Sequence, residues 1–171
     1  MTAAERHPPI VETTSLRWQC EDDTRAFAQR LAAAPALRNA FIELHGDLGA
    51  GKTTLVRHLL QALGVQGRIK SPTYAVVEPH EAPAAAPGRE PLAIWHFDFY
   101  RFGDPREWED AGFRDLFASP GLKLAEWPDK AAAVLPQADL SLHIDALADE
   151  TRTVTLAAHT ATGRALLEAI A

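Results

Sequence analysis

The sequence predicts a single domain of the α/β class, built around a mixed, mostly central β-sheet that is flanked by helices. The chain has 171 residues, the usual size of one domain and long enough to bury a core without disulfides or metals. Short apolar runs that are typical of buried strands alternate with segments whose apolar residues recur at helical spacing. One of these runs leads through a glycine-rich loop directly into a helical segment. Together these three observations define the predicted fold class.

Composition and charge restrict the partners and the compartment. The formal net charge is −6 and no segment concentrates Lys and Arg, so direct binding of nucleic acid is not expected. If the protein acts on a nucleic acid, we expect it to do so through partner proteins. The single cysteine, Cys20, excludes an internal disulfide and fits a reducing compartment. No apolar run approaches the ~20 residues that span a membrane, and Met1 to Pro9 lack a signal-peptide core. We expect a cytoplasmic protein with no membrane contact, a loose tail over residues 1–10 and one domain over residues 11–171.

The first part of the chain is predicted to alternate strands and helices. The acids Glu21 to Asp23 favour a helix N-terminus, and apolar residues from Thr24 to Leu31 recur at helical spacing until Pro35 ends the pattern. A second apolar stripe, from Leu55 to Leu63, predicts another helix that Gly64 closes. The strands of this part are predicted over Ser15 to Cys20 and Ala40 to Leu44.

The second part of the chain is richer in strands. Segments enriched in Val, Ile, Tyr and Trp predict strands over Thr73 to Val77 and Leu92 to Phe99. The Ala- and Pro-rich segment His80 to Pro91 between them is expected to form an exposed hairpin loop. Acids and aromatic residues give Asp104 to Phe117 a helical character. The remaining predicted elements are a buried strand over Leu122 to Ala125, a hairpin of Leu140 to Ile144 with Thr153 to Ala157, and a closing helix over Thr162 to Ile170.

A complete phosphate-binding motif lies between the strand ending at Leu44 and the helix that follows it. The motif G-x-x-x-x-G-K-[ST] is matched in full by Gly46, Asp47, Leu48, Gly49, Ala50, Gly51, Lys52 and Thr53. Its glycines let successive backbone N–H groups point at phosphate oxygens, and the following helix directs its positive dipole end to the same anion. Lys52 would neutralise the β- and γ-phosphates, and the Thr53 hydroxyl is a hard oxygen ligand suited to Mg²⁺. The sequence therefore predicts a P-loop NTPase-like domain that binds ATP and Mg²⁺.

Hydrolysis would need at least one acid near Mg²⁺ and a group that orients water. Asp98 and Glu126 each end a predicted strand, and ligands of doubly wound sheets bind at the carboxyl ends of strands. Both carboxylates could therefore face the phosphates, although a solvated acid at a strand edge fits the pattern equally well. Ser71 and Thr73 could reach the γ-phosphate or Mg²⁺ as a switch segment does, but a turn into a strand is the simpler interpretation. His96 lacks metal-ligand neighbours and is interpreted as structural.

Four linked motifs resemble those of the TsaE family, also called YjeE, over most of the chain, from about Phe41 to Asp145. The motifs are Gly46 to Thr54, Lys70-Ser71-Pro72-Thr73-Tyr74, His96-Phe97-Asp98-Phe99-Tyr100-Arg101 and Glu126-Trp127-Pro128. The resemblance implies a mixed sheet flanked by helices and a bacterial ATPase required for threonylcarbamoylation of adenosine 37 in tRNAs that read ANN codons. It implies TsaB and TsaD as partners, with tRNA reached through their complex.

The resemblance also implies roles for individual residues. Thr53 and Glu126 would hold Mg²⁺ directly or through water, and Asp98 would help to orient water or metal, although the two acids could exchange roles. Lys52, Asp98 and Glu126 would form the catalytic set. The residues implied to contact the nucleotide are Gly46 to Thr54, Ser71, Thr73, Trp127 and, as a weaker candidate, Arg152.

Two other functions fit a P-loop and are kept as alternatives. A small-molecule kinase would need an acceptor pocket and usually an arginine-bearing lid, and the segment Glu81 to Glu90 offers only Arg89. A nucleotide-dependent binding module with negligible catalysis would need only the P-loop. If the chain is an ATPase, we expect slow turnover alone and faster turnover with partners, because no clear arginine finger is visible beyond the conceivable Arg101.

Overall fold

The computed structural model describes residues 10–67, 69, 76–85, 87–103, 106 and 112–171. Within these ranges the strands are β1 (Glu12–Trp18), β2 (Phe41–His45), β3 (Val77–Ala82), β4 (Leu92–Asp98), β5 (Leu122–Glu126), β6 (Leu140–Ala146) and β7 (Arg152–Ala158). The α-helices are α1 (Glu21–Ala32), α2 (Lys52–Ala62), α4 (Phe113–Ala118) and α5 (Ala161–Ile170), and the 3₁₀ helices are η2 (Pro35–Asn39) and η3 (Pro128–Ala131).

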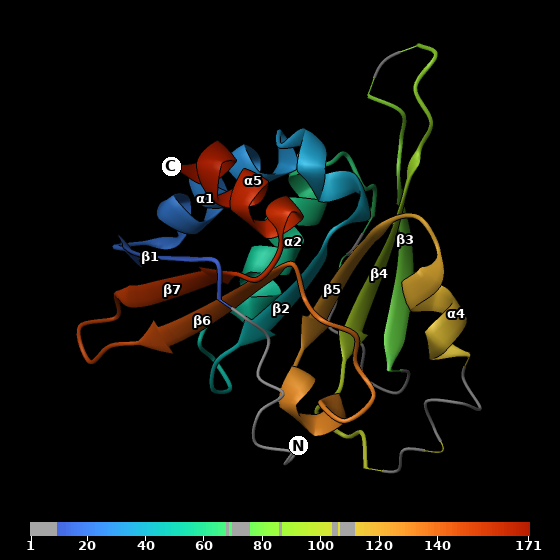
Figure 1. Ribbon diagram of the computed structural model, residues 1–171. Helices are drawn as coiled ribbons and strands as arrows, with labels where there is room; N and C mark the ends of the chain where they lie inside the picture. The colour runs from blue at the N-terminus through green and yellow to red at the C-terminus, as the bar shows by residue number, and fades with distance from the viewer. Residues whose placement is uncertain (1–9, 68, 70–75, 86, 104–105, 107–111) are drawn as a thin grey trace.

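The strands form one mixed sheet in the order β1-β7-β6-β2-β5-β4-β3 (Figure 1). Its centre is parallel, because β2 pairs with both β5 and β6, and β5 pairs with β4. The flanking pairs β1–β7, β6–β7 and β3–β4 are antiparallel. The parallel strands therefore bring their carboxyl ends, and the P-loop that follows β2, to one edge of the sheet.

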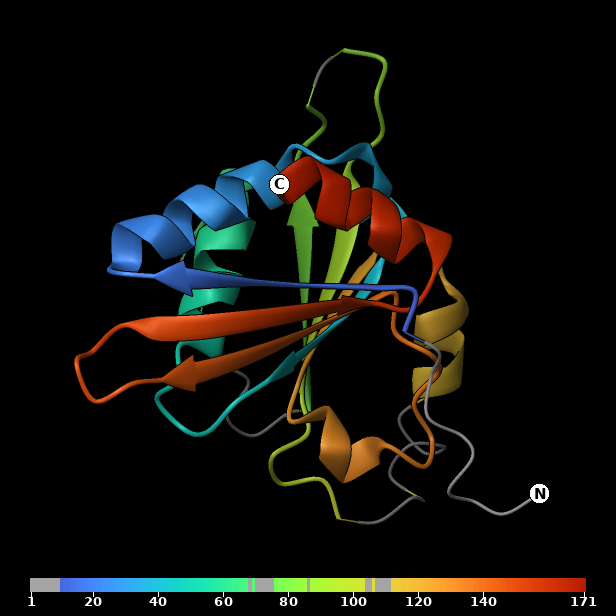
Figure 2. The same ribbon diagram turned by 60° about the vertical axis from the view of Figure 1, so that its left-hand side comes forward.

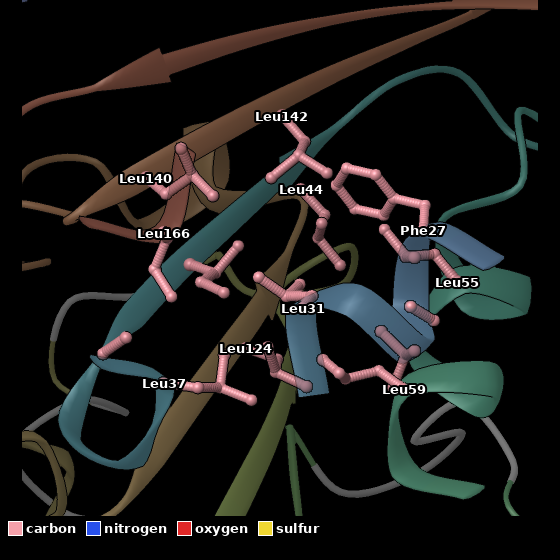
Figure 3. Packing of buried hydrophobic residues seen from close by; sticks show 14 of the residues in the cluster. Phe27, Leu31, Leu37, Leu44, Leu55, Leu59, Leu124, Leu140, Leu142 and Leu166 are labelled. Atoms are coloured by element: carbon pink, nitrogen blue, oxygen red, sulfur yellow. The ribbon is translucent and has the colours of Figure 1, made fainter. Parts of the chain in front are cut away.

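Alternation along the strands divides the core into two clusters on opposite faces. Ile42 and Leu44 of β2 point to the larger cluster, whereas Phe41 joins a smaller aromatic cluster with Phe97 and Phe113. Helices α1, α2 and α5 cover the first face, and Phe27 and other apolar side chains of these helices meet those of the sheet there (Figures 2 and 3). Helix α4 covers part of the second face. Burial on both faces explains why the central strands read as apolar runs.

The predicted fold class is confirmed, but several element boundaries were wrong. β1 begins at Glu12 and ends at Trp18, not Cys20, because it pairs with β7 along its whole length. The predicted loop from His80 is shorter, since His80 to Ala82 continue β3 against β4. The helix predicted over Asp104 to Phe117 lies mostly outside the described residues; Arg106 is helical, and α4 begins at Phe113 after a left-handed Gly112.

Other predictions are confirmed or fall outside the described residues. The hairpin of β6 and β7 and the closing helix α5 are present as expected, and the Thr160 side chain caps α5 by accepting a hydrogen bond from the Gly163 N–H. Of the strand predicted over Thr73 to Val77, only the last two residues are described, and β3 begins at Val77. Nearly all of the predicted N-terminal tail lies outside the described ranges. No helix within the described ranges is long and apolar enough to cross a membrane.

Candidate nucleotide-binding site

The P-loop leaves β2 at His45 and enters α2 at Lys52, as the motif predicts. Gly46 has a φ of +150°, and a Cβ there would lie 2.6 Å from the Ile144 carbonyl oxygen of the neighbouring strand. Gly51 has a φ of +112° and caps α2, and a Cβ there would lie 3.2 Å from Arg152 Nε. Both positions therefore require glycine for backbone conformation and for close approach.

Lys52 points back across the loop and is buried, with 4% of its surface exposed. Its Nζ donates a hydrogen bond to the Gly46 carbonyl and lies 3.6 Å from the centre of the Trp127 ring, a cation–π contact. Burial lowers the pKa of Lys52 below its ordinary value of 10.5, although nearby carboxylates oppose this shift. These carboxylates are those of Glu126, Asp98, Asp47 and Asp129.

The Trp127 ring contacts Lys52 from a position with an unusual backbone conformation. Trp127 follows β5 directly and adopts a left-handed conformation with φ 54° and ψ 47°, which is uncommon for an aromatic residue. Its ring also packs against Tyr100, with 5.0 Å between the ring centres. The structure thus places the predicted Trp127 beside the P-loop lysine.

The two predicted acids end neighbouring strands at the same level, because Asp98 of β4 is paired in register with Glu126 of β5. Glu126 is buried, with 2% exposed, and its Oε1 accepts a hydrogen bond of 2.9 Å from Thr53 Oγ1. Asp98 is half-buried, and its Oδ1 accepts the Tyr100 backbone N–H at 3.0 Å. The structure therefore joins the acid of β5 to the P-loop threonine.

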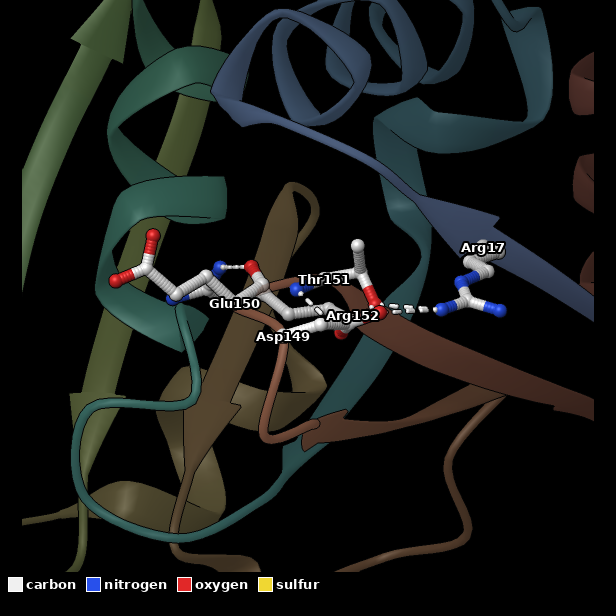
Figure 4. Close-up of polar contacts among 5 residues, drawn as sticks. All are labelled: Arg17, Asp149, Glu150, Thr151 and Arg152. Carbon is white, nitrogen blue, oxygen red and sulfur yellow. Dashed lines mark hydrogen bonds and ion pairs between the residues drawn. The ribbon is translucent and has the colours of Figure 1, made fainter.

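Arg152, at the start of β7, contacts the P-loop from the other side. Its Nε donates a 2.6 Å hydrogen bond to the Ala50 carbonyl. Its Nη1 donates to the Glu150 carbonyl (Figure 4). Arg17 of β1 stabilises the same turn between β6 and β7 by donating to Asp149 and Thr151 at 3.0 and 2.9 Å. The structure thus gives Arg152 a contact with the backbone of the P-loop.

The donor set at the loop fits Mg²⁺ in kind. Thr53, Asp98 and Glu126 offer hydroxyl and carboxylate oxygens, the hard ligands that this ion prefers. Within the described part of the chain no three His, Cys, Asp or Glu side chains are grouped so as to hold a metal ion by themselves. Mg²⁺ commonly combines one or two protein oxygens with phosphate oxygens and water, so a sparse protein set of this kind suits a nucleotide-bound ion.

Two features of the site were not foreseen and one prediction is not described. His96, interpreted as structural, has its Nε2 at 2.5 Å from Glu126 Oε2. Its position two residues before Asp98 on the same strand was the available signal, because residues i and i+2 share a face. The role of Arg17 had no sequence signal. Ser71 and Thr73 lie outside the described residues.

Comparison with known proteins identifies the family. The family model described as "Threonylcarbamoyl adenosine biosynthesis protein TsaE" matches residues 18–154. A protein of Haemophilus influenzae named tRNA threonylcarbamoyladenosine biosynthesis protein TsaE is 40% identical over 145 residues, which is 85% of this chain and 87% of that protein. The protein of the same name from Bacillus subtilis is 33% identical, over 84% of this chain and 85% of its own length.

A solved structure agrees with these sequence matches. The crystal structure of Bacillus subtilis YdiB superimposes with a TM-score of 0.74 at 26% sequence identity, and the match covers 95% of this chain and 96% of that one. Since the family model spans most of the chain and the relatives match along most of their own length, this chain belongs to the TsaE family.

Proposed function

We propose that this chain binds and hydrolyses ATP with Mg²⁺ and serves the biosynthesis of threonylcarbamoyladenosine in tRNA together with TsaB and TsaD. The observation that carries the ATPase proposal is the hydrogen bond from Thr53 Oγ1 to Glu126 Oε1. It joins the threonine of a complete P-loop to a buried acid at a strand end, and this pairing is the one that a Mg²⁺ site in a P-loop protein requires.

Phosphate binding would fall to the P-loop and its lysine. Lys52 would exchange its contact with the Gly46 carbonyl for β- and γ-phosphate oxygens, and the loop N–H groups would donate to the same anion. The four carboxylates near Lys52 would repel the phosphates unless a cation entered with them. This excess of negative charge supports the proposal that ATP binds together with Mg²⁺.

Thr53 and Glu126 would hold Mg²⁺, which supplies charge neutralisation on the phosphate oxygens. Asp98, at the same level of the next strand, would accept a hydrogen bond from a water molecule and orient it. Among the described residues, Arg152 contacts the P-loop, but its Nε is engaged with the Ala50 carbonyl. Slow turnover alone and stimulation by partners are therefore expected, since a stabilising arginine supplied in trans accelerates many P-loop enzymes.

The tRNA part of the proposal follows from the relatives. Both compared proteins carry names that assign them to tRNA threonylcarbamoyladenosine biosynthesis, and the matches extend along most of each protein. The net charge of −6 favours action through a complex over direct binding of tRNA. A kinase lid is not supported by the loop after β3, because Ala82 pairs with Leu92 at the amino end of β4, opposite Asp98 at its carboxyl end.

The decisive experiment measures ATP turnover by the purified chain alone and with TsaB and TsaD. We expect turnover to rise when the partners are added and to be lost in Thr53→Ala and Glu126→Ala. Glu168→Ala, on the exposed face of α5, is the control and should keep wild-type turnover. Unchanged turnover in both site variants would refute the site, and phosphate transfer to a small molecule in place of water would favour a kinase.

A further inference from the structure

His96 and Glu126 form a fully buried polar pair behind the P-loop. His96 has 0% of its surface exposed and Glu126 has 2%, and the distance between His96 Nε2 and Glu126 Oε2 is 2.5 Å. The other carboxylate oxygen, Oε1, accepts from Thr53. Each oxygen of Glu126 therefore has one donor, from the P-loop helix on one side and from the neighbouring strand on the other.

The bond assigns the ring nitrogens of His96. A carboxylate oxygen accepts only, so Nε2 carries the hydrogen in this contact. Nδ1 is buried and has no hydrogen-bond partner within the described part of the chain. A buried polar ring with one unsatisfied nitrogen is costly as a core filler, which indicates that the contact made by Nε2 is the reason for a histidine here.

We propose that His96 is a positioning residue for Glu126, and this inference rests on the proposed ATP and Mg²⁺ site. A glutamate side chain has one more rotatable bond than an aspartate. The Nε2–H bond to Oε2 prevents the Glu126 carboxylate from rotating, so that Oε1 stays directed at Thr53 and at the ion that both residues would hold. Partners of this kind commonly control metal affinity, and their loss costs about 10- to 100-fold in affinity or activity.

Three substitutions separate the hydrogen bond from the volume of the ring. His96→Gln places an amide N–H close to the position of Nε2. The shorter side chain of His96→Asn places its amide N–H close to the position of Nδ1, where it cannot reach Glu126. His96→Met fills a similar volume without a donor. A role limited to packing predicts that Gln is no better than Met, whereas a positioning role predicts that Gln alone restores function.

The readout is the coupling between Mg²⁺ and nucleotide, measured as the ratio of the Kd of a non-hydrolysable ATP analogue in EDTA to its Kd in Mg²⁺. Calorimetry gives both values, and thermal melting reports whether each variant is folded. We expect the ratio to fall about tenfold in His96→Met and His96→Asn and to stay within about threefold of wild type in His96→Gln. In a Glu126→Gln background, His96→Met should change the ratio no further.

Each outcome decides between the two proposals. Equal ratios in wild type and all three variants would overturn the positioning role alone, as would a His96→Gln ratio as low as that of a folded His96→Met. If His96→Met does not fold, the comparison of Gln with Asn gives the same decision. A wild-type chain that binds the analogue equally well with and without Mg²⁺ would instead overturn the proposed ion site, and this inference with it.

Discussion

Asp98 and Glu126 occupy equivalent positions on neighbouring strands, but their surroundings differ. Glu126 is buried and both of its oxygens are engaged, by Thr53 from α2 and by His96 from β4. Asp98 is half-buried, and one of its oxygens accepts the backbone N–H of Tyr100 in the loop that follows its own strand. The comparison indicates that Glu126 is fixed to the P-loop, whereas Asp98 is coupled to the loop after β4.

The largest effect should come from removing the charge of Glu126 without changing its shape. We expect Glu126→Gln to lower the single-turnover rate of ATP hydrolysis by about 10²- to 10⁴-fold, because it weakens the ion site and with it the neutralisation of charge on the phosphate oxygens. Asp98→Asn should cost less, since Glu126 is the acid that is hydrogen-bonded to Thr53. A greater loss in Asp98→Asn would show that the two acids have exchanged roles.

Thr53→Ala should have the next largest effect, and it should weaken the binding of ATP with Mg²⁺ as well as slow hydrolysis. It removes the hydroxyl that contacts Glu126 Oε1 and that would contact the ion. We expect the Kd of ATP in Mg²⁺ to rise by at least about tenfold while the Kd in EDTA stays unchanged. Thr53→Ser keeps the hydroxyl and is the control. Equal weakening of binding in both buffers would place the ion elsewhere.

Lys52 predicts a pH dependence of ATP binding. Burial lowers its pKa below 10.5, and only the protonated ammonium attracts phosphate, so the Kd of ATP should be constant at neutral pH and rise on the alkaline side before an ordinary lysine would titrate. Above the lowered pKa the Kd should increase by up to about tenfold per pH unit. Arginine stays charged at alkaline pH, so in Lys52→Arg the rise of the Kd should disappear. If the Kd still rises with pH in this variant, a group other than Lys52 causes the rise.

The smallest effects are expected on the β7 side of the P-loop. Arg152→Ala removes the donor to the Ala50 carbonyl and should raise the Kd of ATP by about tenfold or less, the range of one hydrogen bond. Arg152→Lys keeps the charge without the Nε donor and separates the two contributions. Arg17→Ala, which breaks an exposed pair with Asp149, should change the Kd by less than about twofold. A larger effect of Arg17 would make the β6–β7 turn part of the site.

Sequence reasoning succeeded where the signal is local. The P-loop is a contiguous motif, and its strand, loop and helix follow one another without any distant contact. The acids Asp98 and Glu126 could be placed at strand ends because apolar runs precede them. Their pairing depends on β4 and β5 being neighbours in register, which no local pattern encodes.

The rest of the site depends on long-range packing. His96 is an ordinary strand residue until β4 lies beside β5 and its ring meets Glu126. Arg17 precedes the turn that it contacts by more than 130 positions, as its bond to Asp149 shows. The start of β1 at Glu12 was missed for the same reason, since its exposed, polar residues form a strand only because β7 lies beside them.

The place of β2 in the sheet has a consequence for the biosynthesis of the chain itself. Leu44, two residues before the P-loop, pairs with Glu126 on one side and Leu142 on the other, and the ribosome makes both partners much later. Distant pairings of this kind form slowly, because a long stretch of chain must lose conformational entropy before the new contacts offset that loss. A nascent chain that still lacks Leu142 therefore carries the whole motif from Gly46 to Thr53 without the sheet that holds it in shape, so that we expect nucleotide binding only after β6 has been made.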